Sequence, residues 1–321
     1  MSRINTKSPA EHPAGGVDVG KRWLDAAVSD DGEVCRCVNS DAGREELIGF
    51  FRRHGVCRVG VEASGGYEFE IVAAMRGAGL DVEVFQPAQV RAYARFLNQR
   101  AKTDRIDARL IAQCAAARRE SRSAPDARLA DFAEQLTYIE QIDEDIARLR
   151  TRLDRYRDRR LIEMMQEEIT RLKARRRKEL RCLRAAVVMH ADLARRLDLL
   201  VSIEGVGERT ALCLLIRMPE LGALTNAQAG ALAGMAPITR QSGSWQGERR
   251  VEGGRARVAK ALFAAAQAAA QRWNRQLVEL YRRLKEKGKH HNVAVVACAR
   301  KLITFANAVL KRQERWSTQC R

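Results

Sequence analysis

The stretch Val17-Asp18-Val19-Gly20-Lys21, near the start of the chain, decides how the first part of the protein is interpreted. It places an aspartate inside a short apolar run that ends in a glycine turn, which is the pattern of a β-strand. An acid inside an apolar strand is costly unless it is paired or bound to a cation. The stretch therefore predicts a strand that carries a functional carboxylate.

Residues 15–86 continue this pattern of short β-type runs and glycine-rich turns, with apolar residues at helical spacing between some of the runs. A second acid, Glu62, ends one of the runs. Strands that alternate with helices are typical of an α/β domain. We expect strands around residues 16–20, 26–28, 34–38, 58–62 and 81–85, and helices around 45–53 and 67–76.

Two further acids, Asp104 and Asp107, are three residues apart and therefore share a face if their segment is helical. Together with Asp18 and Glu62 they form our candidate metal site. Carboxylate oxygens suit Mg²⁺, or Mn²⁺ as the alternative, and such ions bridge to substrate phosphates. Taken singly, each acid is explained better by a turn residue, an edge-strand charge or a helix cap.

The charge of the chain indicates a polyanionic partner. Lys and Arg outnumber Asp and Glu by 58 to 40, which gives a net charge of +18 and a pI near 10.1. Nucleic acid is the leading candidate, ahead of a general solubility role or a membrane surface. No apolar run is long enough to span a membrane and no signal peptide is recognisable, so we expect a cytoplasmic protein. The eight cysteines and five histidines match no zinc-binding spacing.

The middle of the chain is predicted to be helical, because residues 81–204 contain no glycine. Apolar residues step by three and four from Leu129 to Tyr156, as in a coiled coil with a stammer. The chain then either turns back as a helical hairpin or continues as one long arm. Residues 148–184 hold 15 Lys or Arg against 6 Asp or Glu. That bias predicts nucleic-acid binding, with Arg175, Arg176, Arg177 and Lys178 as candidate contacts.

Beyond residue 198 a Gly-x-Gly turn, Gly205-Val206-Gly207, lies between two apolar helical runs. This is similar to a helix-hairpin-helix, whose backbone N–H groups face a phosphate without reading bases. The alternative is a tight turn between packed helices. A glycine-rich loop at 234–254 and two helices, at 257–285 and 291–311, complete the expected elements.

Several of these segments together resemble one family, the Piv-type DNA invertases and DEDD insertion-sequence transposases. The resemblance lies in residues 60–67, 85–90 and 102–108 at one end, and in 231–237, 242–243, 253–255 and 297–302 at the other. It implies an α/β RNase-H-like (RuvC-like) N-terminal domain whose metal ligands are Asp18, Glu62, Asp104 and Asp107. It further implies a catalytic serine, which corresponds to Ser242.

The family pattern has Asp-Ser-Gly at this serine, whereas here Gln241 precedes Ser242. A role for a carboxylate beside the serine is thereby in doubt, and Ser244 is the rival hydroxyl. A serine hydroxyl needs a base or metal to remove its proton before it attacks. The basic side chains expected to hold nucleic acid near the two centres are Lys102, Arg105, Arg109, Arg249, Arg250, Arg255 and Arg257.

The resemblance implies a DNA recombinase that cleaves and rejoins strands, directed by a structured guide RNA. It also suggests a homo-oligomer, from dimer to synaptic tetramer, in which different protomers supply metal site and serine. The rivals are a Holliday-junction resolvase or nuclease in which water attacks, and a non-catalytic nucleic-acid-binding protein. The expected divisions are a flexible tail (1–14), the RuvC-like domain (15–124), a basic helical coiled-coil region (125–198) and a mainly helical serine domain (199–321).

Overall fold

The computed structural model describes residues 13–29, 32–99, 103–118, 126, 128–239, 241–242, 245–247 and 250–317. By its internal contacts the chain divides into two compact units, Met1–Pro125 (unit 1) and Asp126–Arg321 (unit 2). Three candidate residues, Lys102, Ser244 and Arg249, lie outside the described residues.

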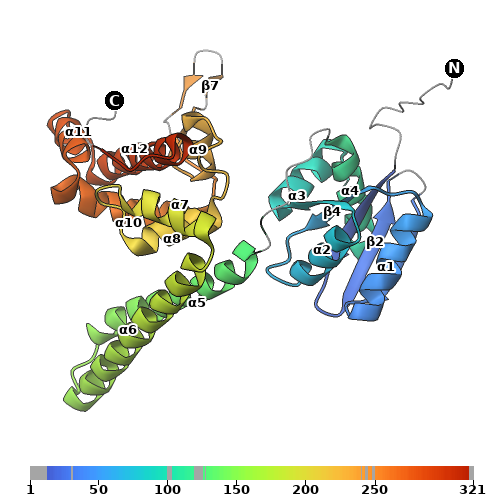
Figure 1. Cartoon of the computed structure of the whole chain (residues 1–321), viewed down its shortest axis with the longest axis horizontal. Coiled ribbons are helices and arrows are strands. Elements are labelled where there is room, and N and C mark those ends of the chain that lie inside the picture. Colours follow the sequence, from blue (N-terminus) through green and yellow to red (C-terminus); the bar gives the residue numbers. More distant parts are fainter. Residues whose placement is uncertain are drawn as a thin grey trace. The chain divides into compact units, whose positions relative to one another are not determined.

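Unit 1 is built on a five-stranded sheet in the order β3-β2-β1-β4-β5 (Figure 1). The central strand β1 pairs antiparallel with β2 and parallel with β4, so the sheet is mixed. The five expected strands are confirmed, with β1 beginning just before the predicted domain start. Their bounds are β1 Ala14–Val19, β2 Trp23–Val28, β3 Val34–Val38, β4 Arg58–Glu62 and β5 Asp81–Phe85.

Helices cover both faces of this sheet, because its strands carry apolar residues on both sides. On one face, Val17 and Val61 pack with Phe51 into a core under the helices α1 and α2. On the other face, Phe85 packs with Ile111 under α3 and α4. The predicted helices are confirmed in this mixed α/β unit, with bounds α1 Asp41–Arg53, α2 Glu68–Gly77, α3 Pro87–Phe96 and α4 Asp104–Ala117.

Unit 2 begins with a helical hairpin, so the hairpin alternative holds over the single long arm. The helix α5 (Arg128–Leu153) is followed after five residues by α6 (Arg159–Val188), which Asp158 caps (Figure 1). Towards the tip, a small core of four residues joins the two helices. At the base, Leu136 of α5 and Leu183 of α6 enter the main core of the unit.

The expected single helix over residues 257–285 is wrong. The chain there forms α10 (Ala256–Ala268), a π-helical turn (Ala269–Trp273) and α11 (Arg275–Glu286). The break falls at Asn274, whose backbone is extended and whose buried side chain accepts a hydrogen bond from Leu277 N. The same side chain donates to Glu204 O, so a tertiary contact fixes the break.

The remaining helices enclose the main core of unit 2. They are α7 Ala191–Val201, α8 Glu208–Arg217, α9 Asn226–Leu232 and α12 His291–Arg312. Within the described part of the chain, α12 is the one helix long and apolar enough to cross a membrane, and 61% of its apolar window is buried inside the unit. That burial is typical of a core helix.

The glycine-rich segment at 234–254 is not simply a loop, as expected, but contains four two-residue strands. β6 (Pro237–Ile238) pairs with β9 (Arg250–Val251), and β7 (Gln241–Ser242) pairs with β8 (Trp245–Gln246). Runs this short carry too little apolar alternation to be recognised as strands in a sequence.

Candidate active site

Two glycines in the sheet decide where α4 lies. Gly16 on β1 is paired in register with Gly60 on β4, and both face α4. A Cβ at Gly16 would overlap the backbone of Ala108 and Ala112, and a Cβ at Gly60 would lie 3.0 Å from Ile111. Since the side chains are absent, the helix packs directly on the sheet backbone. Its first turn is thereby held over the ends of β1 and β4.

This packing gathers the four candidate metal ligands. Asp18 and Glu62 each follow their glycine by two residues, so they point to the same face of the sheet. Asp104 and Asp107 lie in the first turn of α4, which Thr103 caps by accepting a hydrogen bond from Ile106 N. All four line one cavity of about 360 Å³. The structure therefore brings together acids from three separate segments.

The carboxylates are close enough to oppose one another's ionisation. Burial, followed by the negative charges of Asp107, Glu62 and Asp104, raises the pKa of Asp18 to about 6. Among the described residues, no group of three or more His, Cys, Asp or Glu side chains is already arranged to hold a metal ion. An open set of oxygen donors nevertheless fits Mg²⁺, which keeps several waters and takes only a few carboxylates. The donor chemistry and the repulsion both fit a divalent cation.

A fifth acid, Asp25, and Arg36 extend the site across the sheet, and both were missed in the sequence. Asp25 is paired in register with Asp18 on one side and with Arg36 on the other. Asp25 is buried, and Arg36 contacts its carboxylate at 2.9 Å and that of Asp104 at 2.8 Å. Arg36 therefore ties the start of α4 to the sheet. No local signal reveals this, because the Arg36–Asp104 contact joins residues 68 positions apart.

Two arginines of α3, Arg91 and Arg95, and Gln99 in the segment after this helix line the same cavity as the acids. They were also missed. Arg91 and Arg95 are four residues apart on one helix, so their side chains share a face. A site that holds carboxylates on one wall and guanidinium groups on another suits a cation together with a phosphate. The i, i+4 spacing after Pro87 is the one signal that points to them.

The other basic candidates of unit 1 lie on α4. Arg109 donates to Gly32 O at 2.7 Å, which places its guanidinium at the turn between β2 and β3. Arg105 is exposed on the first turn of the helix. Neither is among the residues that line the carboxylate cavity. They sit beside the site instead of within it.

Ser242 lies in the exposed strand β7, where it pairs with Trp245 of β8. Of the arginines expected near it, Arg250 is exposed on β9. Arg255 contacts Glu220 at 2.6 Å, and Arg257 pairs with Glu140, which Arg217 also contacts. Arg255 and Arg257 thus contribute to the ion pairs of unit 2, although Arg257 shares its carboxylate with Arg217.

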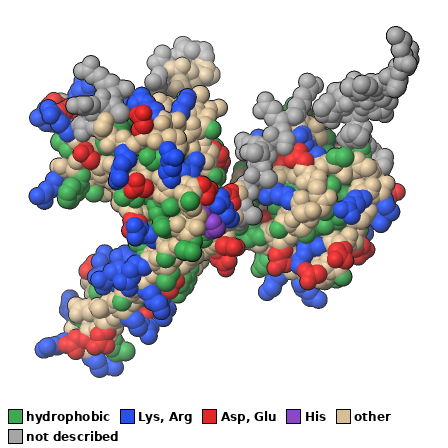
Figure 2. Space-filling model, viewed as in Figure 1, with side chains coloured by type: hydrophobic (Ala, Val, Ile, Leu, Met, Phe, Trp, Pro, Cys, Tyr) green, Lys and Arg blue, Asp and Glu red, His purple; other side chains and the backbone are tan. Residues whose placement is uncertain are grey.

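The basic cluster on α6 is divided in the same way. Arg175, Arg177 and Lys178 are exposed, whereas Arg176 contacts Asp143 of α5 at 2.6 Å. Figure 2 shows Lys and Arg side chains gathered over this hairpin. The exposed cations face solvent and can meet phosphates, while Arg176 joins the two helices.

The Gly-x-Gly turn joins α7 to α8. Gly205 has φ +94° and packs so closely on Ala269 that a Cβ would overlap that residue's side chain. Gly207 is the N-cap of α8, whose first residue, Glu208, lies 3.7 Å from Arg184. The packing accounts for Gly205 as a tight turn between helices. An acidic first turn also makes this helix end less favourable for a phosphate.

Comparison with known proteins identifies two transposase regions in the chain. One family model, described as a transposase, matches residues 15–166, and another, the transposase IS116/IS110/IS902 family, matches residues 197–282. The pilin gene-inverting proteins of Moraxella bovis and Moraxella lacunata are each 25% identical over 317 residues, covering 92% of this chain and 95% of theirs. These matches show that the chain is a DNA recombinase or transposase enzyme of the DEDD insertion-sequence and Piv-type kind.

Proposed function

We propose that this transposase cleaves and rejoins DNA with two centres, the carboxylate cavity of unit 1 and the hydroxyl of Ser242. The observation that carries the proposal is the convergence of four acids on one cavity that also holds two arginines. The mixed sheet and the packing of α4 on it support an RNase-H-like (RuvC-like) arrangement. The transposase matches make DNA the substrate.

In this proposal Asp18, Glu62, Asp104 and Asp107 hold a divalent cation, Mg²⁺ by preference and Mn²⁺ as the alternative. A bound cation offsets the carboxylate charge and polarises a phosphate oxygen. Arg91 and Arg95 orient the DNA phosphate from the opposite wall. These guanidinium groups contribute hydrogen bonds to non-bridging oxygens, which stabilises the added negative charge of the transition state.

Ser242 supplies the nucleophile. Its Oγ attacks the phosphorus of a phosphodiester, so that an Oγ–P bond forms and the bond from phosphorus to one deoxyribose oxygen breaks. The serine proton is passed to the departing oxygen, which leaves as a hydroxyl. The phosphoserine linkage conserves the energy of the phosphodiester, and attack by a hydroxyl of another strand rejoins the DNA without ATP.

We further propose that a structured guide RNA selects the DNA and binds along the basic α5–α6 hairpin. The net charge of +9 between residues 148 and 184 supports this location. A homo-oligomer, dimer to tetramer, would let one protomer's carboxylates act with another's serine. The inverting activity named for the two Moraxella proteins supports a site-specific reaction.

The deciding experiment looks for the phosphoserine linkage. A DNA substrate nicked opposite the cleavage site should trap the protein on DNA in an adduct that needs Mg²⁺ and resists denaturant. Peptide mapping should place the phosphate on Ser242. The Ser242→Ala variant should lose the adduct and still bind the nucleic acid, whereas Ser244→Ala should keep at least part of the activity.

Other outcomes identify the rivals. Phosphate mapped to Ser244 would move the nucleophile by two residues. Cleavage without any adduct would mean that water attacks, as in a resolvase.

A further inference from the structure

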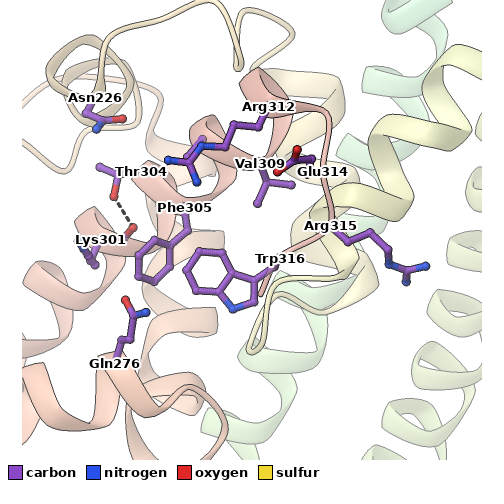
Figure 3. A pocket seen from close by; sticks show the side chains of 11 residues that line it. Asn226, Gln276, Lys301, Thr304, Phe305, Val309, Arg312, Glu314, Arg315 and Trp316 are labelled. Atoms are coloured by element: carbon purple, nitrogen blue, oxygen red, sulfur yellow. Dashed lines mark hydrogen bonds between the residues drawn. The ribbon is translucent and has the colours of Figure 1, made fainter. Parts of the chain in front are cut away.

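A second cavity, of about 610 Å³, lies in unit 2 and takes no part in the proposed chemistry. Its wall is one face of the C-terminal half of α12, together with the segment that follows this helix (Figure 3). Gln313, in the left-handed conformation, ends α12, and Trp316 N then donates to Ser202 Oγ at 2.8 Å. The chain thereby folds back and returns Trp316 to the helix.

An aromatic pair lies in the middle of this cavity. The rings of Phe305 and Trp316 are 4.2 Å apart between centroids, side by side in Figure 3. Phe305 is buried, whereas Trp316 is half-buried and offers part of its ring. Its Nε1 is shielded from water and has no hydrogen-bond acceptor among the described residues. The part of the Trp316 ring that is open to the cavity is therefore apolar, which suits the face of a flat ligand.

Cations flank the aromatic pair. Lys301 lies over the Phe305 ring, 5.2 Å from its centroid, and Arg312 lies on the side opposite Gln276 (Figure 3). Neither Lys301 nor Arg312 forms an ion pair with an acid in the described part of the chain, whereas Arg315 pairs with Asp198. The cavity therefore offers two cations that form no ion pair among the described residues, beside an aromatic surface and one acid, Glu314.

We propose that this cavity binds an unpaired nucleotide of a nucleic acid strand. The base would lie against Trp316, and the phosphate would meet Lys301 and Arg312. Aromatic stacking combined with cations is how proteins hold single strands without reading a long sequence. Paired bases are stacked on their neighbours and cannot enter such a cavity, so the site selects unpaired nucleotides.

A neighbouring aromatic side chain supports a strand over an isolated nucleotide. Trp273 lies three residues before Gln276 of the cavity wall and is 64% exposed. Arg272 lies over its ring at 5.8 Å. A second aromatic surface with its own cation, close in the chain to Gln276 of the cavity wall, suits the next base of the same strand.

The test measures binding of the full chain to three probes in EDTA, without any cleavage. The probes are a 12-nucleotide uridine RNA and the thymidine DNA of the same length, each with one 2-aminopurine, and a 12-base-pair duplex. With either single strand, 2-aminopurine fluorescence should fall because the base stacks on Trp316, and loss of Arg312 should weaken binding of the single strands more than binding of the duplex. Preference for RNA would identify the guide as the source of the nucleotide, and preference for DNA an opened substrate strand.

Two adjacent residues of α12 give a matched pair of variants. Arg312→Gln removes a cation from the cavity, whereas Lys311→Gln removes one from the same helix turn outside it. Arg312→Gln should weaken single-strand binding by roughly tenfold, and Lys311→Gln by less than about twofold. Trp316→Leu, which keeps an apolar contact with Phe305, should abolish the change in 2-aminopurine fluorescence.

Equal losses in the two variants would mean that only general surface charge matters, and would overturn the proposal. So would a fall in 2-aminopurine fluorescence that Trp316→Leu leaves unchanged. The assay needs neither the carboxylates nor Ser242, so its failure would leave the proposed recombination chemistry untouched.

Discussion

Asp18 and Ser242, the two proposed catalytic centres, lie in strands with opposite surroundings. Asp18 belongs to the central strand of a sheet that helices cover on both faces, and α4 packs on its backbone through Gly16. Ser242 belongs to a two-residue strand that is exposed and pairs only with β8 within the described residues. Asp18 is therefore held in the packed core of unit 1, whereas Ser242 lies on an exposed strand.

The two centres are positioned by different means. The carboxylates are positioned by backbone packing before any substrate arrives, so a change there alters the stability of the unit as well as its chemistry. No core of that kind packs on the serine within the described residues, so we expect its position to be completed when DNA or a second protomer binds. A change at Ser242 should alter chemistry alone.

The largest effect is expected on recombination itself. Asp18→Asn and Ser242→Ala should each lower product by at least about a thousandfold, because each removes a group on which the whole reaction depends. Nucleic-acid binding should stay within a few-fold of wild type. Product from a plasmid recombination assay and binding by filter retention measure the two. Wild-type rates in a protein carrying Asp18→Asn and Asp104→Asn would end the metal-site proposal.

The next effect tests whether backbone packing positions the acids. Gly16→Ala should push α4 from the sheet, destabilise unit 1 by about 1–3 kcal/mol and reduce activity, although no carboxylate is changed. Gly49→Ala in α1 is the control, since its Cβ meets nothing closer than 3.6 Å, and it should stabilise by about 0.5–1 kcal/mol. Amide hydrogen exchange of residues 14–28 in the full chain measures the stability of unit 1 in both variants. Normal activity in Gly16→Ala would contradict the account of α4.

A smaller effect should distinguish the two centres by the stability of the protein when each is substituted. Without divalent cation, Asp18→Asn should stabilise unit 1 by about 1 kcal/mol, allowing for solvent screening, because burial and nearby carboxylates disfavour its charge. Ser242→Ala should stay within about 0.5 kcal/mol of wild type. Mg²⁺ should then stabilise the wild type more than Asp18→Asn. Thermal unfolding with and without EDTA measures all three, and identical Mg²⁺ shifts would argue against Asp18 as a ligand.

The smallest effect concerns salt dependence. Replacing Arg175, Arg177 and Lys178 by Gln should flatten the slope of log K against log salt by about one unit for each phosphate that the protein no longer neutralises. Arg176→Gln should flatten it less, because Arg176 already pairs with Asp143. RNA-binding titrations from low to high salt compare the two proteins. A larger change in the salt slope from Arg176→Gln than from the triple variant would mean that Arg176, and not the three exposed residues, contacts the nucleic acid.

Much of unit 1 could be predicted from the sequence, because its strands are short apolar runs between glycine turns and its acids follow those runs directly. Asp25, Arg36, Arg91 and Arg95 could not be. The role of Arg36 depends on the pairing of β3 with β2 and on its contact with Asp104 of α4. No spacing in the sequence reveals either of these. The arginines of α3 share a helix face, but nothing local shows that this face meets the acids.

Unit 2 was predictable in its helices and less so in its breaks. The absence of glycine and the apolar spacing indicate α5 and α6, and the charged turn between them allowed a hairpin. The interruption at Asn274 escaped prediction, because a hydrogen bond to Glu204, 70 residues earlier, stabilises it. The short strands around Ser242 escaped for a different reason, since two residues carry no periodicity.

The length of the α5–α6 hairpin has a consequence for the spacing of bound nucleic acid. From its start at Arg159 to Leu183, where it enters the main core, α6 rises about 35 Å at 1.5 Å per residue. One turn of duplex DNA is about 34 Å long. If a DNA duplex lay along the hairpin, the same groove would therefore face the hairpin at both ends of this helix. Removing one heptad from each helix, which preserves the apolar seam, would shorten that span by roughly 10 Å and place the two ends on different sides of the duplex.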